Sequence, residues 1–320
     1  MEQKIIIDAD PGVDDTAAIL LALASPEVSV QAITAVYGNG VVENCTRNAL
    51  TILEAAQRSD IPVFKGASTP LTRKPHIAKF FHGENAFGNV SFPEPQNSAQ
   101  QEHAAVALVE KVMANPHEIK VVALGPLTNV ALALSLEPRL AENIQQLIIM
   151  GGAVFTYGNA TPTASANLFN DPEAAAIVFR SGVNLVQVGL DVCRKVFFSQ
   201  QDLDRISTAK TPTTDMLAKI TPFHANAGRK TAADGEIPSN AVERYNDIPA
   251  IAYCVWPSFF KSKRFFVQIS VHDELTLGQT VADVGRIYKK EPNADVLLEV
   301  NAEAVVKNTI DRITTYRTEI

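Results

Sequence analysis

The sequence predicts an α/β fold: a mostly parallel, doubly wound (Rossmann-like) sheet with helices on both faces. Short runs rich in Ile and Val alternate along the chain with longer segments of helical periodicity, the order typical of βαβ units. The strand runs are almost continuously apolar, as strands covered on both faces usually are. Pro26, Pro138 and Gly182 stand shortly after helical segments, where helix-ending residues are expected.

The expected elements alternate along the chain. Short β-branched runs predict strands at Lys4–Ile7, Val28–Val36, Ile119–Ala123, Gln145–Met150 and Val183–Val188. Apolar residues that recur every three or four positions predict helices at Val13–Ala24, Val42–Gln57, His103–Ala114, Leu127–Leu136 and Pro172–Ser181. Toward the C-terminus the same criteria predict helices at Pro249–Val255 and Ala302–Tyr316, and strands at Phe265–Val271 and Val296–Val300.

Residues 200–246 carry a weaker pattern than the rest of the chain. Thr208–Thr214 is polar and contains Pro212, and Asp234–Asn240 has the composition of a loop. Long connections without strong periodicity often serve as lids or binding loops. We therefore expect a variable substrate-binding or lid region at about 200–246. We expect it to lie within a single domain, residues 1–320, because no linker-like stretch divides the chain.

The composition excludes several classes of protein. The chain of 320 residues is 46% hydrophobic and 20% charged, as in soluble globular proteins. A net charge of −7 without a Lys/Arg cluster argues against nucleic acid or an anionic membrane as partner. No apolar run has the length of a membrane span, and the N-terminal run is too short for a signal peptide. The three widely spaced cysteines fit neither disulfides nor zinc, so we expect a cytoplasmic protein with a small-molecule partner.

An acidic loop follows the first strand. Asp8, Asp10, Asp14 and Asp15 fall within eight residues, interrupted by Pro11-Gly12. Ligands of parallel α/β sheets bind at the carboxyl ends of strands, where this loop lies. A cation relieves the repulsion of such close carboxylates, and all-oxygen ligands favour Ca²⁺ or Mg²⁺. The alternative is a solvated acidic turn in which Asp14 and Asp15 cap the next helix.

Other polar segments also follow predicted strands. They are Tyr37-Gly38-Asn39-Gly40, Leu124-Gly125-Pro126-Leu127-Thr128-Asn129, and the loop after Met150-Gly151-Gly152 that carries Asn159 and Asn167. Asn246-Asp247 stands directly before a predicted helix. Each segment taken alone is ordinary turn chemistry. Their shared position at strand ends predicts a pocket lined by carboxylates and amides, which suits a polyhydroxylated ligand such as a sugar.

These segments together resemble the inosine–uridine-preferring nucleoside hydrolase family. The resemblance rests on Asp8-x-Asp10-Pro11-Gly12-x-Asp14-Asp15, Gly38-Asn39, Gly125-Pro126-Leu127-Thr128-Asn129, Met150-Gly151-Gly152, Gly158-Asn159-x-Thr161-Pro162, Asn167 and Asp171-Pro172-Glu173-Ala174-Ala175. It implies the nucleoside hydrolase fold and a homodimer or homotetramer. It also implies hydrolysis of the N-glycosidic bond of a ribonucleoside by a Ca²⁺-activated water, with release of ribose and free base.

The resemblance also implies a role for individual residues. Ca²⁺ would be held by the carboxylates of Asp10, Asp15 and Asp247 and by the main-chain carbonyl of Leu124, with Asp10 as general base. The ribose 2′- and 3′-hydroxyls would be bound by Asp14, Asn39, Asn167 and Asp247. Asn159 would approach the 5′-hydroxyl, and His82 matches a histidine that lies near the base in many members.

Two positions depart from the family pattern. Asn246 stands where inosine–uridine members have a histidine thought to protonate the leaving purine, and a carboxamide cannot act as an acid. Either the proton comes from elsewhere, with His82 and His224 as the candidates, or the favoured substrate needs less activation of its leaving group. Ser165 stands where members usually have a glutamate that accepts a hydrogen bond from the 5′-hydroxyl, and we expect it among the residues that bind the substrate. Its presence predicts altered selection at that end of the sugar, including a 5′-modified nucleoside.

Two other functions are considered. A non-catalytic or very slow ribose-binding relative would explain Asn246 and Ser165, although the retention of all the implied metal ligands favours an enzyme. A Mg²⁺-dependent phosphatase of the aspartate-nucleophile type would use Asp8 as nucleophile and Asp10 as acid. It fits poorly, because Pro11-Gly12 replaces the usual Gly-Thr and the Asp14-Asp15 pair is unexplained.

Overall fold

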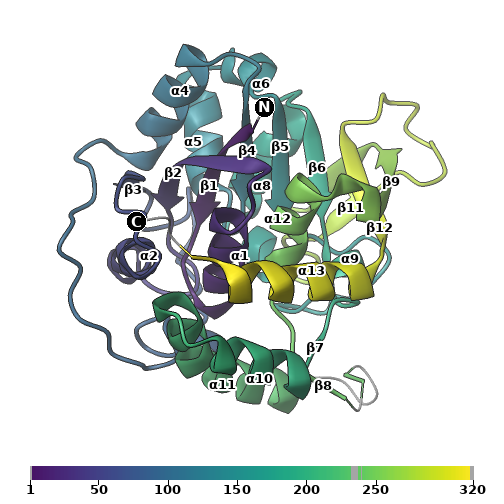
Figure 1. Cartoon of the computed structure of the whole chain (residues 1–320). Coiled ribbons are helices and arrows are strands. Elements are labelled where there is room, and N and C mark those ends of the chain that lie inside the picture. Colours follow the sequence, from purple (N-terminus) through teal and green to yellow (C-terminus); the bar gives the residue numbers. More distant parts are fainter. Residues whose placement is uncertain (1, 232–236, 239, 318–320) are drawn as a thin grey trace.

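The computed structural model describes residues 2–231, 237–238 and 240–317. Eight strands form the central sheet, in the order β3 (Val63–Lys65), β2 (Val28–Ala35), β1 (Gln3–Ala9), β4 (Ile119–Ala123), β5 (Gln146–Met150), β6 (Leu185–Val188), β12 (Ala294–Val300) and β9 (Phe260–Phe265). All neighbours are parallel apart from β9, which pairs antiparallel with β12 at one edge. The predicted mostly parallel α/β sheet is confirmed (Figure 1).

Helices cover both faces of this sheet. One apolar core packs the sheet against α1 (Val13–Leu23), α2 (Val42–Ala55), α12 (Ile248–Val255) and α13 (Ala302–Thr315). A second core packs the other face against α4 (Ala104–Ala114), α5 (Thr128–Leu136) and α8 (Pro172–Arg180). The short helices are α3 (Lys79–His82), α6 (Leu140–Asn143), α7 (Ala166–Asn170), α9 (Leu190–Cys193) and a 3₁₀ turn at Pro257–Phe259. The doubly wound arrangement explains why the inner strands are apolar on both sides.

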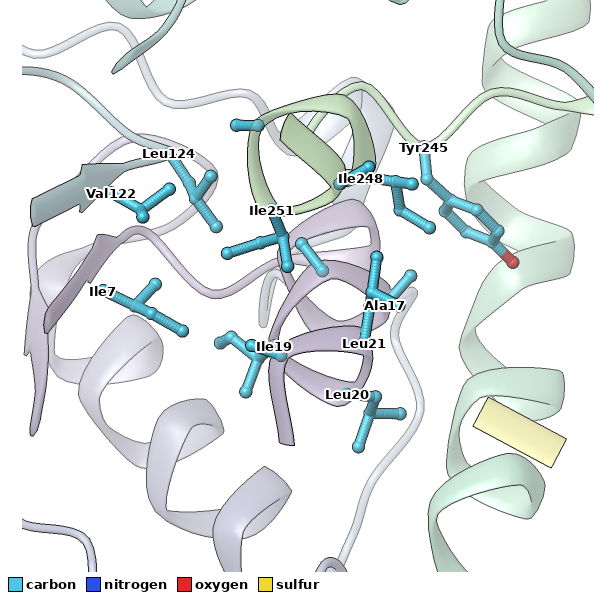
Figure 2. Packing of buried hydrophobic residues seen from close by; sticks show 14 of the residues in the cluster. Ile7, Ala17, Ile19, Leu20, Leu21, Val122, Leu124, Tyr245, Ile248 and Ile251 are labelled. Carbon is cyan, nitrogen blue, oxygen red and sulfur yellow. The ribbon is translucent and has the colours of Figure 1, made fainter. Parts of the chain in front are cut away.

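Helix α1, which directly follows the acidic loop, is completely buried: each of its eleven residues is buried. Figure 2 shows Ile7 of β1 and Val122 of β4 beside Ile19 of α1 and Ile251 of α12, all within one core. Because α1 is held on all sides, its first turn, which carries Asp14 and Asp15, is fixed relative to the strand ends. The site described below is therefore built on rigid elements.

The region at about 200–246 differs from the prediction. It is mostly helical, with α10 (Gln200–Ala209), α11 (Pro212–Thr231) and a small sheet of β7 (Phe198–Ser199) and β8 (Ala241–Glu243). Pro212 is the first residue of α11, where a helix does not need the missing backbone N–H. It therefore begins a helix and does not indicate a loop. In α10 only Ile206 is buried, and the polar remainder hid its helical pattern. Of the predicted loop Asp234–Asn240, residues 234–236 and 239 lie outside the described residues.

The C-terminal strands also differ in part. The predicted strand Phe265–Val271 is divided between the end of β9 and β10 (Val267–Ile269), which pairs with β11 (Thr280–Ala282) outside the central sheet. The edge strand β9 was missed because its four middle residues, Lys-Ser-Lys-Arg, are exposed and break the apolar pattern. In the part of the chain that the structure describes, no helix is both long and apolar enough to cross a membrane.

Candidate active site

A cavity of about 700 Å³ lies at the carboxyl ends of the central strands. Ten of the residues singled out in the sequence line it: Asp10, Asp14, Asn39, His82, Leu124, Asn159, Asn167, His224, Asn246 and Asp247. Residues from the ends of β1, β2, β4 and β5 meet here with residues from α11 and the start of α12, as parallel topology requires. The expectation of one pocket lined by carboxylates and amides therefore agrees with the geometry.

Four buried aspartates form an acidic cluster at this cavity: Asp10, Asp14, Asp15 and Asp247. Asp10 accepts a hydrogen bond from the main-chain N–H of Asn39 at 2.7 Å. Asp15 does not line the cavity but accepts hydrogen bonds from the N–H of Gly12 at 3.0 Å and from the Asn39 amide at 2.8 Å. The Oδ1 atoms of Asp14 and Asp15 are buried without a hydrogen-bond partner.

The acidic cluster has the properties of a cation site. Burial, followed by the repulsion of neighbouring carboxylates, raises the pKa of Asp15 to about 7 and the pKa values of Asp10 and Asp247 well above the usual range. Oxygens of Asp14, Asp15 and Asp247 lie within 4.8 Å of one another. Asp10 falls outside that set, although it lines the same cavity. The partnerless oxygens and all-oxygen donors fit a hard divalent cation better than a solvated acidic turn.

The amides are placed around the acidic cluster. Asn167 donates hydrogen bonds from Nδ2 to the main-chain carbonyl of Leu124 and, at 3.1 Å, to that of Met150. The Leu124 carbonyl, an implied metal ligand, is thus bonded to a side chain that lines the cavity. Asn159 accepts a hydrogen bond at Oδ1 from the N–H of Ala166 at 2.8 Å, which ties its loop to the start of α7.

Two histidines face each other in the cavity, with their ring centroids 4.9 Å apart. His82 accepts a hydrogen bond at Nδ1 from the N–H of Val13 at 3.3 Å, and burial next to charged His224 lowers its pKa well below the usual range. His224 pairs through Nδ1 with Oε1 of Glu243 at 2.9 Å. Burial opposes its charged form, but the charge and hydrogen bond of Glu243, together with the charge of Asp14, raise the pKa of His224 to about 9. One ring is therefore neutral and the other cationic at neutral pH.

Comparison with known proteins identifies the fold and the family. Residues 5–307 match the family model described as inosine-uridine preferring nucleoside hydrolase. The chain belongs to this family. It is 38% identical over 317 residues to the pyrimidine-specific ribonucleoside hydrolase RihA of Escherichia coli, covering 99% of this chain and 100% of that one. It is 38% identical to the probable uridine nucleosidase 2 of Oryza sativa, covering 89% and 83%.

Solved structures agree with this assignment. The purine-preferring ribonucleoside hydrolase from Gardnerella vaginalis superposes with a TM-score of 0.92 at 31% identity, over 98% of this chain and 99% of that one. A plant nucleoside hydrolase superposes with a TM-score of 0.92 at 34% identity, over 98% and 100%. The predicted family, nucleoside hydrolase fold and enzyme class, hydrolysis of the N-glycosidic bond of ribonucleosides, are confirmed.

Ser165 and Asp8 of this nucleoside hydrolase, like Asp15, lie away from the cavity lining. Ser165 is fully buried, and its Oγ accepts a hydrogen bond from the N–H of Gly152 at 2.6 Å. We therefore correct its expected contact with the sugar: the hydroxyl is short and is already used within the loop. Asp8 accepts hydrogen bonds from Thr34 at 2.6 Å and Asn129 at 2.8 Å and does not line the cavity, so it is not placed as a phosphatase nucleophile.

Sequence reasoning missed other residues that line the cavity of this nucleoside hydrolase. Glu243 lies in β8, and its pairing with His224 of α11 spans nineteen positions, which no local pattern shows. Arg194, directly after α9, stacks over the Tyr157 ring at 3.7 Å from guanidinium carbon to ring centroid. It also donates a hydrogen bond to the carbonyl of Gly158 at 2.9 Å. A lone Arg or Glu in the sequence carries no signal of such partners.

Gly125 is required for the position of Asp10 in this nucleoside hydrolase. A Cβ atom added at residue 125 would lie 2.6 Å from Oδ1 of Asp10 and 2.8 Å from Val36. We expect Gly125→Ala to lower kcat about 10- to 100-fold, because it displaces the Asp10 carboxylate while the sheet stays folded. The measurement is nucleoside hydrolysis together with thermal melting.

The matched control for Gly125→Ala is Gly285→Ala. An added Cβ at residue 285 would meet its nearest neighbour, Ile287, only at an ordinary 3.4 Å. We expect this variant to keep the activity of the parent enzyme. Equal rates for Gly125→Ala and Gly285→Ala would show that the carboxylate of Asp10 tolerates the displacement.

Proposed function

We propose that this enzyme hydrolyses ribonucleosides with a Ca²⁺ ion held at the acidic cluster and with Asp10 as general base. The observation that carries the proposal is the meeting of four buried carboxylates, some with partnerless oxygens, at a cavity also lined by amides and histidines. Asp10, Asp15, Asp247 and the Leu124 carbonyl are the proposed ligands, with Asp14 close by. When bound, Ca²⁺ would lower the pKa of water at the site and grip the ribose diol.

In this proposal Asp10 takes the proton of the attacking water. Its carboxylate lines the cavity and is held by the N–H of Asn39, so its orientation is fixed before the substrate arrives. Burial and the charges of Asp15 and Asp14 raise its pKa well above that of an exposed aspartate. A carboxylate of raised pKa is a stronger base, and such tuning is typical of general bases that work near neutral pH.

The remaining polar residues would bind and orient the sugar. We propose that Asp14, Asn39, Asn167 and Asp247 bond to the 2′- and 3′-hydroxyls, since all four line the cavity beside the proposed metal ligands. Asn159, on the loop before α7, would approach the 5′-hydroxyl. With the ribose fixed, C1′ faces the water activated by Asp10, and surrounding carboxylates stabilise the oxocarbenium-like transition state.

The nucleobase of the preferred substrate is proposed by analogy with the relatives. The relatives RihA and uridine nucleosidase are named for pyrimidine nucleosides, whereas the Gardnerella enzyme is named as purine-preferring. We propose uridine as the first substrate to test, because the closer sequence identities are with the former group. Further proposals from the family resemblance are a cytoplasmic location, which the three buried free cysteines suit, and a homodimer or homotetramer, which sedimentation velocity would determine.

The test is release of reducing sugar from uridine, cytidine, inosine, adenosine and their 5′-deoxy forms, with Ca²⁺ and with EDTA. We expect Ca²⁺-dependent release from at least one ribonucleoside. Because Ser165 does not line the cavity and leaves Asn159 as the proposed contact of the 5′-hydroxyl, we expect weaker discrimination against the 5′-deoxy forms than a glutamate at position 165 would give. Silence across the panel, with Ca²⁺ and ribose binding still seen by calorimetry, would support the non-catalytic alternative instead.

A further inference from the structure

We infer that His224 is the general acid that protonates the leaving base, and that Glu243 is the positioning residue that orients it. This inference rests on the proposed hydrolase function. A nucleobase leaves far more readily when a nitrogen or oxygen of its ring system is protonated. Asn246, at the position of the expected histidine, lines the cavity but is a carboxamide and cannot supply that proton.

The geometry of the His224–Glu243 pair suits an acid that faces a substrate. Both side chains line the cavity, and His224 is only 6% exposed. Nδ1 of His224 is 2.9 Å from Oε1 of Glu243, which also accepts a hydrogen bond from the N–H of Arg244 at 2.6 Å. Both contacts are made by the same oxygen, so the main-chain N–H of Arg244 fixes the oxygen that orients the imidazole ring. With Nδ1 engaged, Nε2 is the ring nitrogen left to donate toward a ligand.

The second histidine of the cavity is placed for a different role. Nδ1 of His82 already accepts a hydrogen bond from the N–H of Val13, so a proton on that nitrogen would break this contact. The rings of His82 and His224 lie 4.9 Å apart between centroids and are tilted by 41°, and this closeness further disfavours a second positive charge. Of the two histidines, His224 alone has a carboxylate within hydrogen-bond distance. We assign His82 to contact with the base rather than to proton donation.

The charged groups around His224 favour its protonated form. Glu243 of β8 and Asp14 of α1 are the acidic groups that act on it, while burial and the positive charges of Arg244 and of any protonated His82 oppose them. The balance raises the pKa of His224 to about 9. The imidazole therefore carries its proton throughout the neutral range, as an acid poised for a leaving group must.

The step balances in atoms and charge. The C1′–N bond breaks and its electron pair goes to the base, which receives the proton from Nε2 of His224. Water adds its oxygen to C1′ and gives one proton to Asp10. The products are ribose and the neutral base; exchange with solvent then returns a proton to His224 and removes one from Asp10. Glu243 keeps its charge throughout.

The first experiment compares leaving groups. We expect His224→Gln to lower kcat on uridine and inosine by about 10²–10⁴-fold. On p-nitrophenyl β-D-ribofuranoside we expect a loss below about threefold, because p-nitrophenolate departs without a proton. Retained activity on the nitrophenyl riboside also shows that the variant is folded. His272→Gln, at an exposed histidine far along the chain, is the matched control and should keep both activities.

The second experiment tests the positioning role by pH profile. A general acid works only below its pKa, so kcat of the wild type on nucleosides should hold up to pH of about 9. Glu243→Gln removes the charge that raises the pKa of His224, so burial dominates and the alkaline limb moves to lower pH. We expect a loss of about tenfold or more at pH 8 that is partly recovered near pH 6. A merely structural role would lower the rate equally at both pH values.

The outcomes separate the inference from the function on which it rests. If the wild type cleaves neither nucleosides nor the nitrophenyl riboside, the proposed function fails. If the wild type is active but His224→Gln loses activity on nucleosides and on the nitrophenyl riboside equally, or on neither, His224 is not the general acid. An unchanged pH profile in Glu243→Gln overturns the positioning role alone.

Discussion

Asp10→Asn lowers kcat on any nucleoside that the wild type cleaves by about 10²–10⁴-fold, the range expected when a general base is lost. Asparagine keeps an oxygen for the N–H of Asn39, which Asp10 binds at 2.7 Å, so the loop stays in place. The carboxamide cannot take a proton from water. Steady-state rates with Ca²⁺, and thermal melting to establish folding, measure the effect.

The control for this prediction is Asp60→Asn. Asp60 is exposed and pairs with Arg58 at 2.8 Å on the surface, so the same chemical change there should leave kcat unaltered. The leaving-group test separates base from acid, because loss of Asp10 should slow nucleosides and p-nitrophenyl riboside alike. An Asp10→Asn enzyme that keeps a third or more of the wild-type rate would exclude Asp10 as the base.

The parts of the molecule that the sequence predicted well are those determined by local pattern. The inner parallel strands are continuous apolar runs, and the aspartates Asp10, Asp14 and Asp15 after the first of them indicate a site at the strand end. Because parallel strands place their carboxyl ends at one edge, residues as distant as Asp10 and Asn167 could be expected together. Ser165 shows the limit: the family motif predicts it at the sugar, yet its hydroxyl bonds to Gly152 away from the cavity.

The parts that could not be predicted depend on long-range contacts. The His224–Glu243 pair forms because α11 and β8 lie against each other. This packing produces no periodic pattern of residues from which the pair could be predicted. Helix α11 itself contains Pro222, which sequence rules treat as a helix breaker, and its polar face obscures the buried one. The exposed charges of β9 similarly reflect its place at the sheet edge, known only once the sheet is assembled.

Removal of the divalent cation should abolish hydrolysis and also destabilise the enzyme in a pH-dependent way. Burial and neighbouring charge raise the pKa of Asp15 to about 7, against 3.8 in the unfolded chain. Without a cation the folded state therefore binds a proton that the unfolded state has lost, and stability falls as pH rises from about 4 to about 7. We expect the Tm in EDTA to be at least about 5 °C lower at pH 8 than at pH 5.5.

Added Ca²⁺ should counteract this loss of stability at high pH. A bound cation neutralises the buried carboxylates, as protons do at low pH. Its stabilising effect should be larger at pH 8 than at pH 5.5, since protons compete with it for the same carboxylates. Asp15→Asn is the sharpest comparison: it carries no charge at either pH, so its Tm in EDTA should fall less than that of the wild type. The wild-type Tm in EDTA could instead stay level or rise toward pH 8. That result would mean that groups of the protein itself neutralise the charge of the buried carboxylates, and that the acidic cluster needs no cation.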